Sequence, residues 1–426
     1  MKASGARLAA TRVLFRVAEE GAYASPALDA EIARAGLDRR DAALATELVY
    51  GTLRALPAVD RVLDARLARP SKTDAWLRAA LRAGAYQLLH LSRVPPHAAV
   101  SQTVSVVRRE RGPRLAGVAN AVLRKVARER PADPRPPERT LLPAWIERAV
   151  RDGLGEARAD AFLGARRLPP PLGLRAVGTP AGALADALRD ARPRATVEVS
   201  RLVEGAVTVR GAGDPRALPG FEEGRFAVQE LGSQRIVALA EVAPGERVAD
   251  LCAGHGTKTL AFAERVGPDG RVEAVDLYEE KLERLEEERA RLRLPAARIG
   301  TRAVDLTVGT GGLEAASFDR VILDAPCTGL GTVHRRPELS LRLCPDDPAR
   351  LAALQARLLE TARSLVRPGG TLVYAICSPT RAEVAPALAG PPPLEEGADE
   401  DGVVRLGPWL GEELDAYQVV RWRRPR

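Results

Sequence analysis

Two cysteines each follow a short apolar run, and one of them lies beside an acid. Residues 321–323 precede Asp324-Ala325-Pro326-Cys327, and residues 372–376 precede Cys377. Apolar runs of this length are typical of buried strands, and open α/β folds build their sites at the carboxyl ends of strands. A lone cysteine is usually a small buried hydrophobe. Two cysteines at strand ends, one of them near an acid, predict that Asp324, Cys327 and Cys377 form one reactive site.

A second group of residues predicts a site for an adenosine-type cofactor. Residues 247–252 are typical of a short strand and run into a turn that contains Gly254 and Gly256. Glycines there let the backbone approach a ligand closely, and the amides at the following helix start favour negative charge. A further strand pattern ends in Asp276, 20 residues beyond Gly256, where an acid can bind both ribose hydroxyls. The alternative is a structural turn followed by a solvated acid.

The residues that follow Gly256 bear on the class of cofactor. A dinucleotide fingerprint places Gly or Ala three residues later, where this chain has Thr259. A dinucleotide, and with it a nicotinamide enzyme, is therefore disfavoured against S-adenosylmethionine. Lys258 adds a clue, because it is one of only five lysines beside 59 arginines and a compact ammonium is chemically distinct from a guanidinium. Chance placement of this lysine is the alternative.

The elements that must position these residues occupy the last part of the chain. From residue 231 to residue 426, strand patterns alternate with helical ones, which predicts a parallel sheet covered on both faces. Residues 143–230 predict two short helices and a small mixed region, with strand alternation at 196–199 and 206–209. Prolines at 131, 134, 136 and 137 indicate a linker over residues 131–142.

Residues 1–130 form the most basic part of the chain. Their pattern is helical, and they carry 23 Lys and Arg against 12 Asp and Glu, a charge of +11 beside −3 for the remainder. Such a domain attracts a polyanion by releasing counterions, so we expect RNA or DNA as a partner. The alternative is a solvated arginine-rich surface.

Composition excludes several classes of protein. No apolar run approaches the roughly 18 residues that span a bilayer, and no apolar core of a secretory signal follows the N-terminus. We therefore expect a cytoplasmic protein. The four cysteines are too widely spaced for a disulfide framework. Scattered histidines predict no metal site; they are His90, His97, His255 and His334.

These motifs together resemble a known family. The chain carries Asp250-Leu251-Cys252-Ala253 with Lys258-Thr259, then Asp324–Thr332 with its Asp-Ala-Pro-Cys block, then Cys377-Ser378. This set is similar to that of the Sun, or NOL/NOP, RNA cytosine-5 methyltransferases. The front of the chain resembles the NusB-type helical domain of one bacterial branch, through segments at 44–51, 82–89, 94–100 and 120–124. The resemblance implies a NusB-like domain, a small α+β connector and a Rossmann-like class I methyltransferase domain, with small-subunit ribosomal RNA as substrate and no obligate protein partner.

The resemblance also implies a role for each site residue. Cys377 would add to carbon 6 of cytosine, Cys327 would assist release of the product, and Asp324 would bind the base near N3 and lie beside the cofactor. Asp276 would bind the ribose of S-adenosylmethionine, and Asp305 would lie near its adenine. The cofactor would run along Cys252, Ala253, Gly254, His255, Gly256, Thr257 and Lys258.

The chain departs from the family pattern in three places. Gly254-His255-Gly256-Thr257 stands where the family usually has Ala-Pro-Gly-Gly, and residues 379–384 replace a segment that often ends in Glu-Asn. Residues 414–418 replace the usual Gly-Phe-Phe. A catalytically weakened RNA-binding or ribosome-assembly factor that retains the fold is therefore the alternative function.

Overall fold

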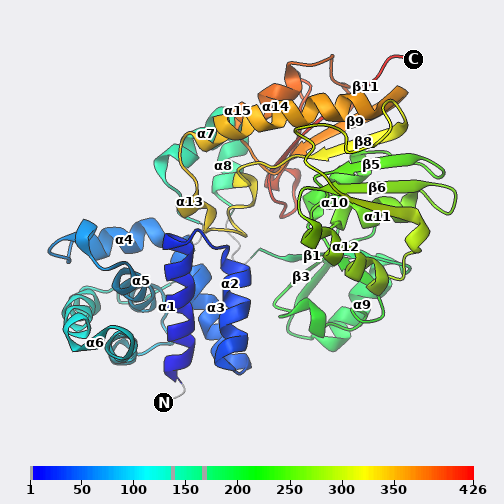
Figure 1. The fold of residues 1–426 in the computed structure, drawn as a ribbon. Helices are drawn as coiled ribbons and strands as arrows, with labels where there is room; N and C mark the ends of the chain where they lie inside the picture. The colour runs from blue at the N-terminus through cyan, green and yellow to red at the C-terminus, as the bar shows by residue number, and fades with distance from the viewer. Residues whose placement is uncertain (1–2, 136–139, 166–169) are drawn as a thin grey trace. The chain divides into compact units, whose positions relative to one another are not determined.

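The structure is a computed structural model that describes residues 3–135, 140–165 and 170–426 (Figure 1). Pro136 and Pro137 of the expected linker lie outside these residues. The chain forms two compact units. One comprises residues 1–147 together with 333–344, and most of the remainder forms the other.

The first unit is helical, as predicted. Its main elements are α1 (Ala3–Glu19), α2 (Ala24–Ala35), α3 (Arg39–Arg54), α4 (Leu56–Asp64), η1 (Pro70–Lys72), α5 (Ala75–His90), α6 (Pro96–Arg128) and α13 (Leu339–Arg342). Helices α3 and α5 begin where the side chains of Asp38 and Asp74 each accept a hydrogen bond from the backbone amide of the third residue of the helix. Helix α6 is two helices joined by a kink at Gly112-Pro113, where proline removes a backbone donor.

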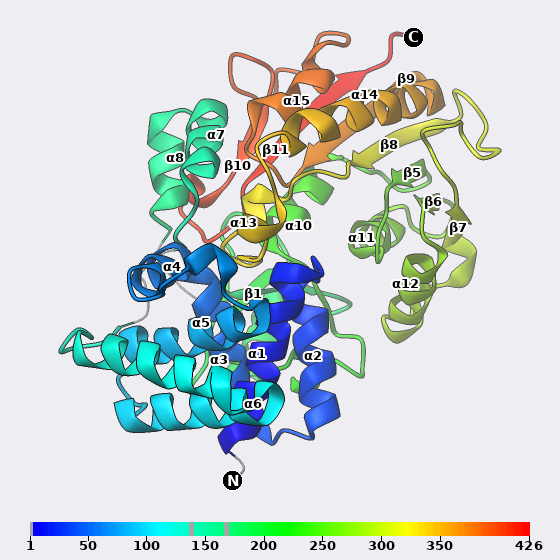
Figure 2. The same cartoon turned by 60° about the vertical axis from the view of Figure 1, so that its left-hand side comes forward.

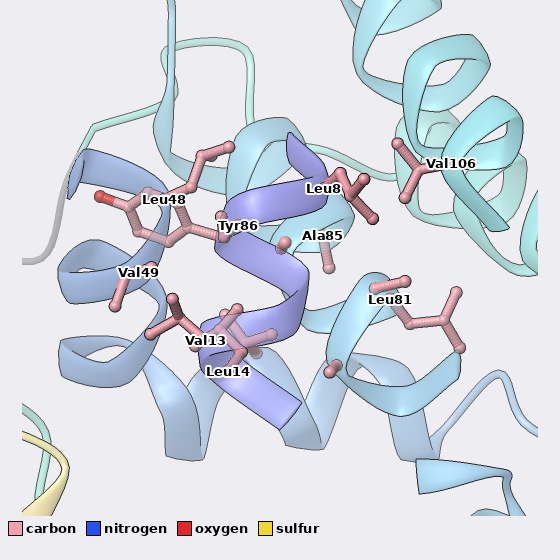
Figure 3. Packing of buried hydrophobic residues seen from close by; sticks show 14 of the residues in the cluster. Leu8, Val13, Leu14, Leu48, Val49, Leu81, Ala85, Tyr86 and Val106 are labelled. Atoms are coloured by element: carbon pink, nitrogen blue, oxygen red, sulfur yellow. The ribbon is translucent and has the colours of Figure 1, made fainter. Parts of the chain in front are cut away.

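Apolar residues of α1 form the centre of this unit. Figure 3 shows Val13 and Leu14 of α1 close to Val49 of α3, with Tyr86 of α5 nearby. Tyr86 is fully buried, and its hydroxyl donates to Glu47 Oε1 at 2.5 Å. The helical pattern in the sequence therefore corresponds to one packed core.

The second unit contains a small antiparallel sheet. After α7 (Ala144–Leu154) and α8 (Glu156–Leu163), strands lie in the order β2-β3-β1-β4, with α9 packed on them. The elements are β1 (Leu172–Ala176), α9 (Ala181–Ala191), β2 (Thr196–Val199), β3 (Ala206–Arg210), η2 (Pro215–Ala217) and β4 (Phe226–Val228). The strands expected at 196–199 and 206–209 are present.

The same unit contains a seven-stranded sheet of order β10-β11-β9-β8-β5-β6-β7. Its elements are α10 (Leu231–Leu239), β5 (Arg247–Leu251), α11 (Thr257–Arg265), β6 (Arg271–Asp276), α12 (Glu279–Arg291), η3 (Ala296–Arg298), β7 (Ile299–Ala303), β8 (Phe318–Asp324), η4 (Leu330–Thr332), α14 (Asp347–Leu365), β9 (Val366–Ile376), α15 (Arg381–Leu388), β10 (Val404–Leu406), η5 (Pro408–Leu410) and β11 (Tyr417–Arg423).

This sheet is mixed, not parallel throughout. Strands β5 to β9 pair in parallel, whereas β11 pairs antiparallel with both β9 and β10. The difference from the expected parallel sheet has a simple cause. A parallel connection needs a long crossover, usually a helix, and residues 407–416 between β10 and β11 hold only the short η5.

Helices cover both faces of the large sheet (Figures 1 and 2). Alternate residues of β8 enter different cores: Ile322 belongs to a core with residues of α10, α11 and α12, and its neighbours Val321 and Leu323 belong to a core with residues of α14 and α15. The chain runs from β5 outward to β6 and β7, and then returns to β8 on the other side of β5. Such a reversal opens a crevice at the carboxyl ends of the strands.

Candidate active site

The ends of three adjacent strands bring the predicted residues together. Leu251 of β5 lies opposite Leu323 of β8, which lies opposite Tyr374 of β9. The loops that start at Cys252, Asp324 and Cys377 therefore leave the same edge of the sheet. The Sγ atoms of Cys327 and Cys377 lie 3.4 Å apart, and both side chains are partly exposed.

The Cys327 thiol lies beside a second sulfur and is largely shielded from solvent. The hydrogen bond with Cys377 raises the pKa of the Cys327 thiol, and burial raises it further. Cys327 therefore keeps its proton more firmly than an ordinary cysteine.

An ion pair joins the cofactor turn to the loop of Cys327. The ammonium of Lys258, whose side chain is 9% exposed, donates to Asp324 Oδ2 at 2.6 Å. Burial lowers the pKa of Lys258, but attraction to Asp324, Asp250 and Cys377 outweighs this effect and raises it. Lys258 therefore stays charged and stabilises negative charge in the crevice.

A buried acid, Asp250, lies on β5 close to this pair. Its Oδ2 accepts a hydrogen bond from Thr259 Oγ1 at 2.6 Å. Burial raises the pKa of Asp250 to about 7, and the charge of Asp324 adds to the rise. Asp250 therefore holds a proton more easily than an ordinary carboxyl group.

The expected cofactor turn is held by Asp276 at the end of β6. Asp276 Oδ2 accepts from the Gly254 amide at 2.9 Å, and Oδ1 accepts from the Tyr278 amide and from Lys281 Nζ, both at 3.1 Å. Gly256 has a φ of +76°, and a Cβ atom there would lie 2.2 Å from Leu285 Cγ. A strand-end acid tied to a turn that needs glycine fits an adenosine cofactor.

Cys252, at the start of the same turn, is a different kind of thiol. Its φ of 59° is unusual for a residue other than glycine. Burial raises its pKa well above the usual range. Cys252 is therefore suited to shaping the turn and not to nucleophilic attack.

The other expected cofactor residues lie around this turn. His255 is exposed and, with Thr257 and Glu283, lines a hollow of about 730 Å³ beside α12. Asp305 is exposed after β7, and its carboxylate accepts from the amide and hydroxyl of Thr307. Ala253 donates its amide to Val275 O at 2.9 Å. Asp305 follows β7, the last strand at one side of the sheet, whereas the cysteine loops follow β8 and β9 on the other side of β5.

Sequence reasoning missed Glu383 as a member of the site. Its fully buried carboxylate accepts hydrogen bonds from Thr328 and Ser378, which directly follow the two cysteines. Thr380-Arg381-Ala382-Glu383 matches the capping-box pattern. That signal indicates a helix start at this position, and it gives no hint of a contact with the loop of Cys327.

Comparison with known proteins bears on the whole chain. The family described as 16S rRNA methyltransferase RsmB/F matches residues 237–389, and the NusB family matches residues 4–128. A putative methyltransferase of Mycobacterium tuberculosis, MT1451, is 38% identical over 90% of this chain and 86% of its own length. Ribosomal RNA small subunit methyltransferase B of Pseudomonas putida is 33% identical over 87% of this chain and 85% of its own. The chain belongs to the RsmB/F family.

Family membership makes the chain an RNA methyltransferase with a NusB domain at its front. The solved structure titled PH0851 has the same fold, with a TM-score of 0.81, 23% sequence identity and coverage of 97% of this chain and 98% of that one. The NusB-like helical domain and the Rossmann-like domain predicted from sequence are therefore confirmed.

The NusB domain carries a basic groove within α6. Arg108 of its first half and Arg124 and Arg128 of its second half line an open space of about 720 Å³, together with His97 and Asn120. All three arginines are exposed. Positive charge around a groove of this size is suited to phosphate groups.

Two other kinds of feature are absent from the residues that the structure describes. Among them, no cluster of three or more His, Cys, Asp or Glu side chains could hold a metal ion. No helix in the described part of the chain is both long and apolar enough to cross a membrane.

Proposed function

We propose that this RsmB/F family member transfers a methyl group from S-adenosylmethionine to carbon 5 of a cytosine in small-subunit ribosomal RNA, through a covalent adduct with Cys377. The observation that carries the proposal is the pair of sulfur atoms 3.4 Å apart beside the Lys258–Asp324 ion pair. Carbon 5 of cytosine is a poor nucleophile, and prior addition of a thiolate at carbon 6 makes it reactive.

The proposed reaction uses four residues of the crevice. Cys377 adds to carbon 6, and Asp324 binds the base near N3, where it stabilises the charge that develops. Lys258 holds Asp324 in place through the 2.6 Å contact and offsets the negative charge of the thiolate. Water then takes the proton of carbon 5, the double bond between carbons 5 and 6 re-forms, and Cys377 leaves carbon 6 as a thiolate; Cys327 assists this release.

The proposed cofactor would be held by the turn after β5 and by the acid after β6. Bound S-adenosylmethionine supplies an electrophilic methyl group. Asp276 would bind the ribose hydroxyls, residues 252–258 would line the bound molecule, and Asp305 would lie near the adenine. The open space around the Cβ position of Gly254 supports this assignment, because a ligand could approach the backbone there.

We further propose that the NusB domain binds ribosomal RNA through its basic surface and that the protein acts in the cytoplasm, where its substrate is. Phosphate contacts would orient the RNA, and contacts in the crevice would select the base.

One experiment tests the activity and its target together. Purified protein is incubated with small-subunit ribosomal RNA and isotope-labelled S-adenosylmethionine, and the modified nucleotide is located by mass mapping. We expect 5-methylcytosine at one position. RNA binding without methyl transfer would support the ribosome-assembly alternative, and methylation at another atom would refute the cytosine-5 assignment.

A further inference from the structure

Glu383 is a buried acid that has no part in the reaction steps proposed for the cysteines. It lies in the first turn of α15 and is 0% exposed. A carboxylate is costly to bury unless hydrogen bonds or opposite charges compensate it. The Glu383 carboxylate therefore requires partners that compensate its burial.

The carboxylate of Glu383 links the two cysteine loops. Its Oε2 accepts hydrogen bonds from the hydroxyls of Thr328 at 2.7 Å, Ser378 at 2.5 Å and Thr380 at 2.7 Å. Its Oε1 accepts from the Thr328 amide at 2.7 Å. Thr328 directly follows Cys327, and Ser378 directly follows Cys377. One side chain thus holds the residue next to each cysteine.

Helix capping does not explain this arrangement. In a capping box, the Glu side chain would accept from the amide of Thr380, and the Thr380 hydroxyl would accept from the amide of Glu383. Here Thr380 makes no side-chain cap; its hydroxyl donates to the Glu383 carboxylate, and its amide donates to Ser378 Oγ at 3.3 Å. The carboxylate is directed to the cysteine loops instead.

Two further elements fix Glu383 itself. The Tyr374 hydroxyl, on β9, donates to the Glu383 carbonyl at 2.7 Å. Gln355 Nε2, on α14, donates to Pro326 O at 2.9 Å and lies 3.4 Å from Glu383 Oε1. A rigid strand and a long helix therefore support the network, as a preorganised site requires.

We propose that Glu383 is a positioning residue that holds the loops of Cys327 and Cys377 in one geometry, so that both sulfurs reach the same base. The inference rests on the proposed function, because it assumes that attack and release occur at one cytosine. The negative charges of Asp324, Cys377 and Glu383 all act on Cys327, while Lys258 acts on Asp324 and Cys377. Glu383 therefore also helps Cys327 to keep its proton.

Glu383→Gln tests the inference with little change in shape. The amide removes the charge and replaces one acceptor by a donor, so either the three hydroxyls at Oε2 or the Thr328 amide at Oε1 loses its acceptor. We expect kcat to fall by about 10- to 100-fold, as for a small misplacement of reacting groups, while KM for RNA and cofactor stays within about twofold. Alkylation of Cys327 by iodoacetamide, followed by peptide mass mapping, should begin at lower pH than in the wild type.

Threonine variants provide a second test if Glu383→Gln does not fold. Thr328→Val and Thr380→Val each remove one donor to the carboxylate at nearly constant volume, and each should lower kcat. Thr371→Val, a buried position on β9 whose hydroxyl contacts Arg320, is the matched control and should keep wild-type kcat.

The outcomes separate this inference from the proposed function. Wild-type kcat and an unshifted alkylation profile in Glu383→Gln, or wild-type kcat in both threonine variants, would overturn the role of Glu383. A wild-type protein that forms neither methylated RNA nor an adduct would overturn the proposed function instead.

Discussion

The Sγ atoms of Cys327 and Cys377 lie 3.4 Å apart, although 50 residues separate them in the chain. This distance is too long for a disulfide bond and short enough for one sulfur to accept a proton from the other. The hydrogen bond to Cys377 raises the pKa of the Cys327 thiol, and burial raises it further. The proposed mechanism gives these two identical side chains different roles.

Serine substitution should separate the two cysteines. Cys377→Ser should lower methylation by about 10⁴-fold or more, the scale for loss of a nucleophile, and should form no adduct, because a hydroxyl at neutral pH is a far weaker nucleophile than a thiolate. Cys327→Ser should allow attack and trap methylated RNA on the protein. A denaturing gel with labelled RNA distinguishes the two variants, provided that both fold and bind cofactor.

The opposite pattern is informative as well. Accumulation of adduct in Cys377→Ser but not in Cys327→Ser would reverse the two roles. Full activity in both variants would refute the cysteine mechanism.

Asp276→Ala should weaken cofactor binding. The substitution removes the proposed ribose contacts and the acceptor of the Gly254 amide, a loss of about 1–3 kcal/mol, or roughly 5- to 150-fold in Kd. Calorimetry with S-adenosylmethionine measures the change. Asp269→Ala, at an exposed position, is the control and should bind like the wild type; unchanged affinity in Asp276→Ala would reject the ribose assignment.

Asp250 should make stability depend on pH. Its folded-state pKa of about 7 lies above the ordinary value of 3.8, so the stability that its protonated form contributes is fully present below about pH 4 and is lost as pH rises through about 7. Asp250→Asn should remove this dependence. As pH rises from 5 to 7, the free energy of unfolding of the variant should increase relative to that of the wild type by at most about 1 kcal/mol per pH unit.

Urea unfolding of the two proteins at several pH values measures this difference. Asp269→Asn serves as the matched control at an exposed site. Parallel stability curves for Asp250→Asn and the wild type would show that Asp250 is already ionised at pH 5.

Charge reversal should reveal whether the groove of α6 binds RNA. Arg108, Arg124 and Arg128 changed together to Glu should lower RNA affinity and reduce its salt dependence, by about 0.7 in log–log slope for each phosphate that the variant no longer binds. The control variant changes Arg39, Arg40 and Arg69, which are also exposed, and has the same net charge. Equal affinity and slope in the two variants would mean that the groove has no special role.

Deletion of residues 1–130 is a poorer test of the same point. Residues 333–344 pack in the helical unit, so the deletion would expose Leu339, which is 6% exposed in the intact protein. Charge reversal leaves this packing unchanged.

The crevice could be predicted from the sequence because each pattern that indicates it lies within a few consecutive residues. Apolar strands that end in Asp324, Cys377 and Asp276 are visible as patterns, and parallel strands bring their carboxyl ends to one edge. The Lys258–Asp324 and Glu383–Thr328 contacts join residues 66 and 55 positions apart, and no periodicity records which side chains meet. The antiparallel β11 was missed for a similar reason, because strand direction depends on the connection and not on the strand's own residues.

Residues 333–344 have a consequence for the order in which the protein is made. Glu338 Oε1 accepts from the Ala24 amide at the start of α2 at 3.2 Å, and the guanidinium of Arg342 lies 3.7 Å from the ring centre of Tyr23. The ribosome synthesises these partners about 210 residues after α6 ends at Arg128, a delay of about 10–40 s at about 5–20 residues per second. During that interval the N-terminus of α2 lacks its acidic partner. The helical unit is therefore the first to begin folding but can be completed only after most of the catalytic sheet has left the ribosome.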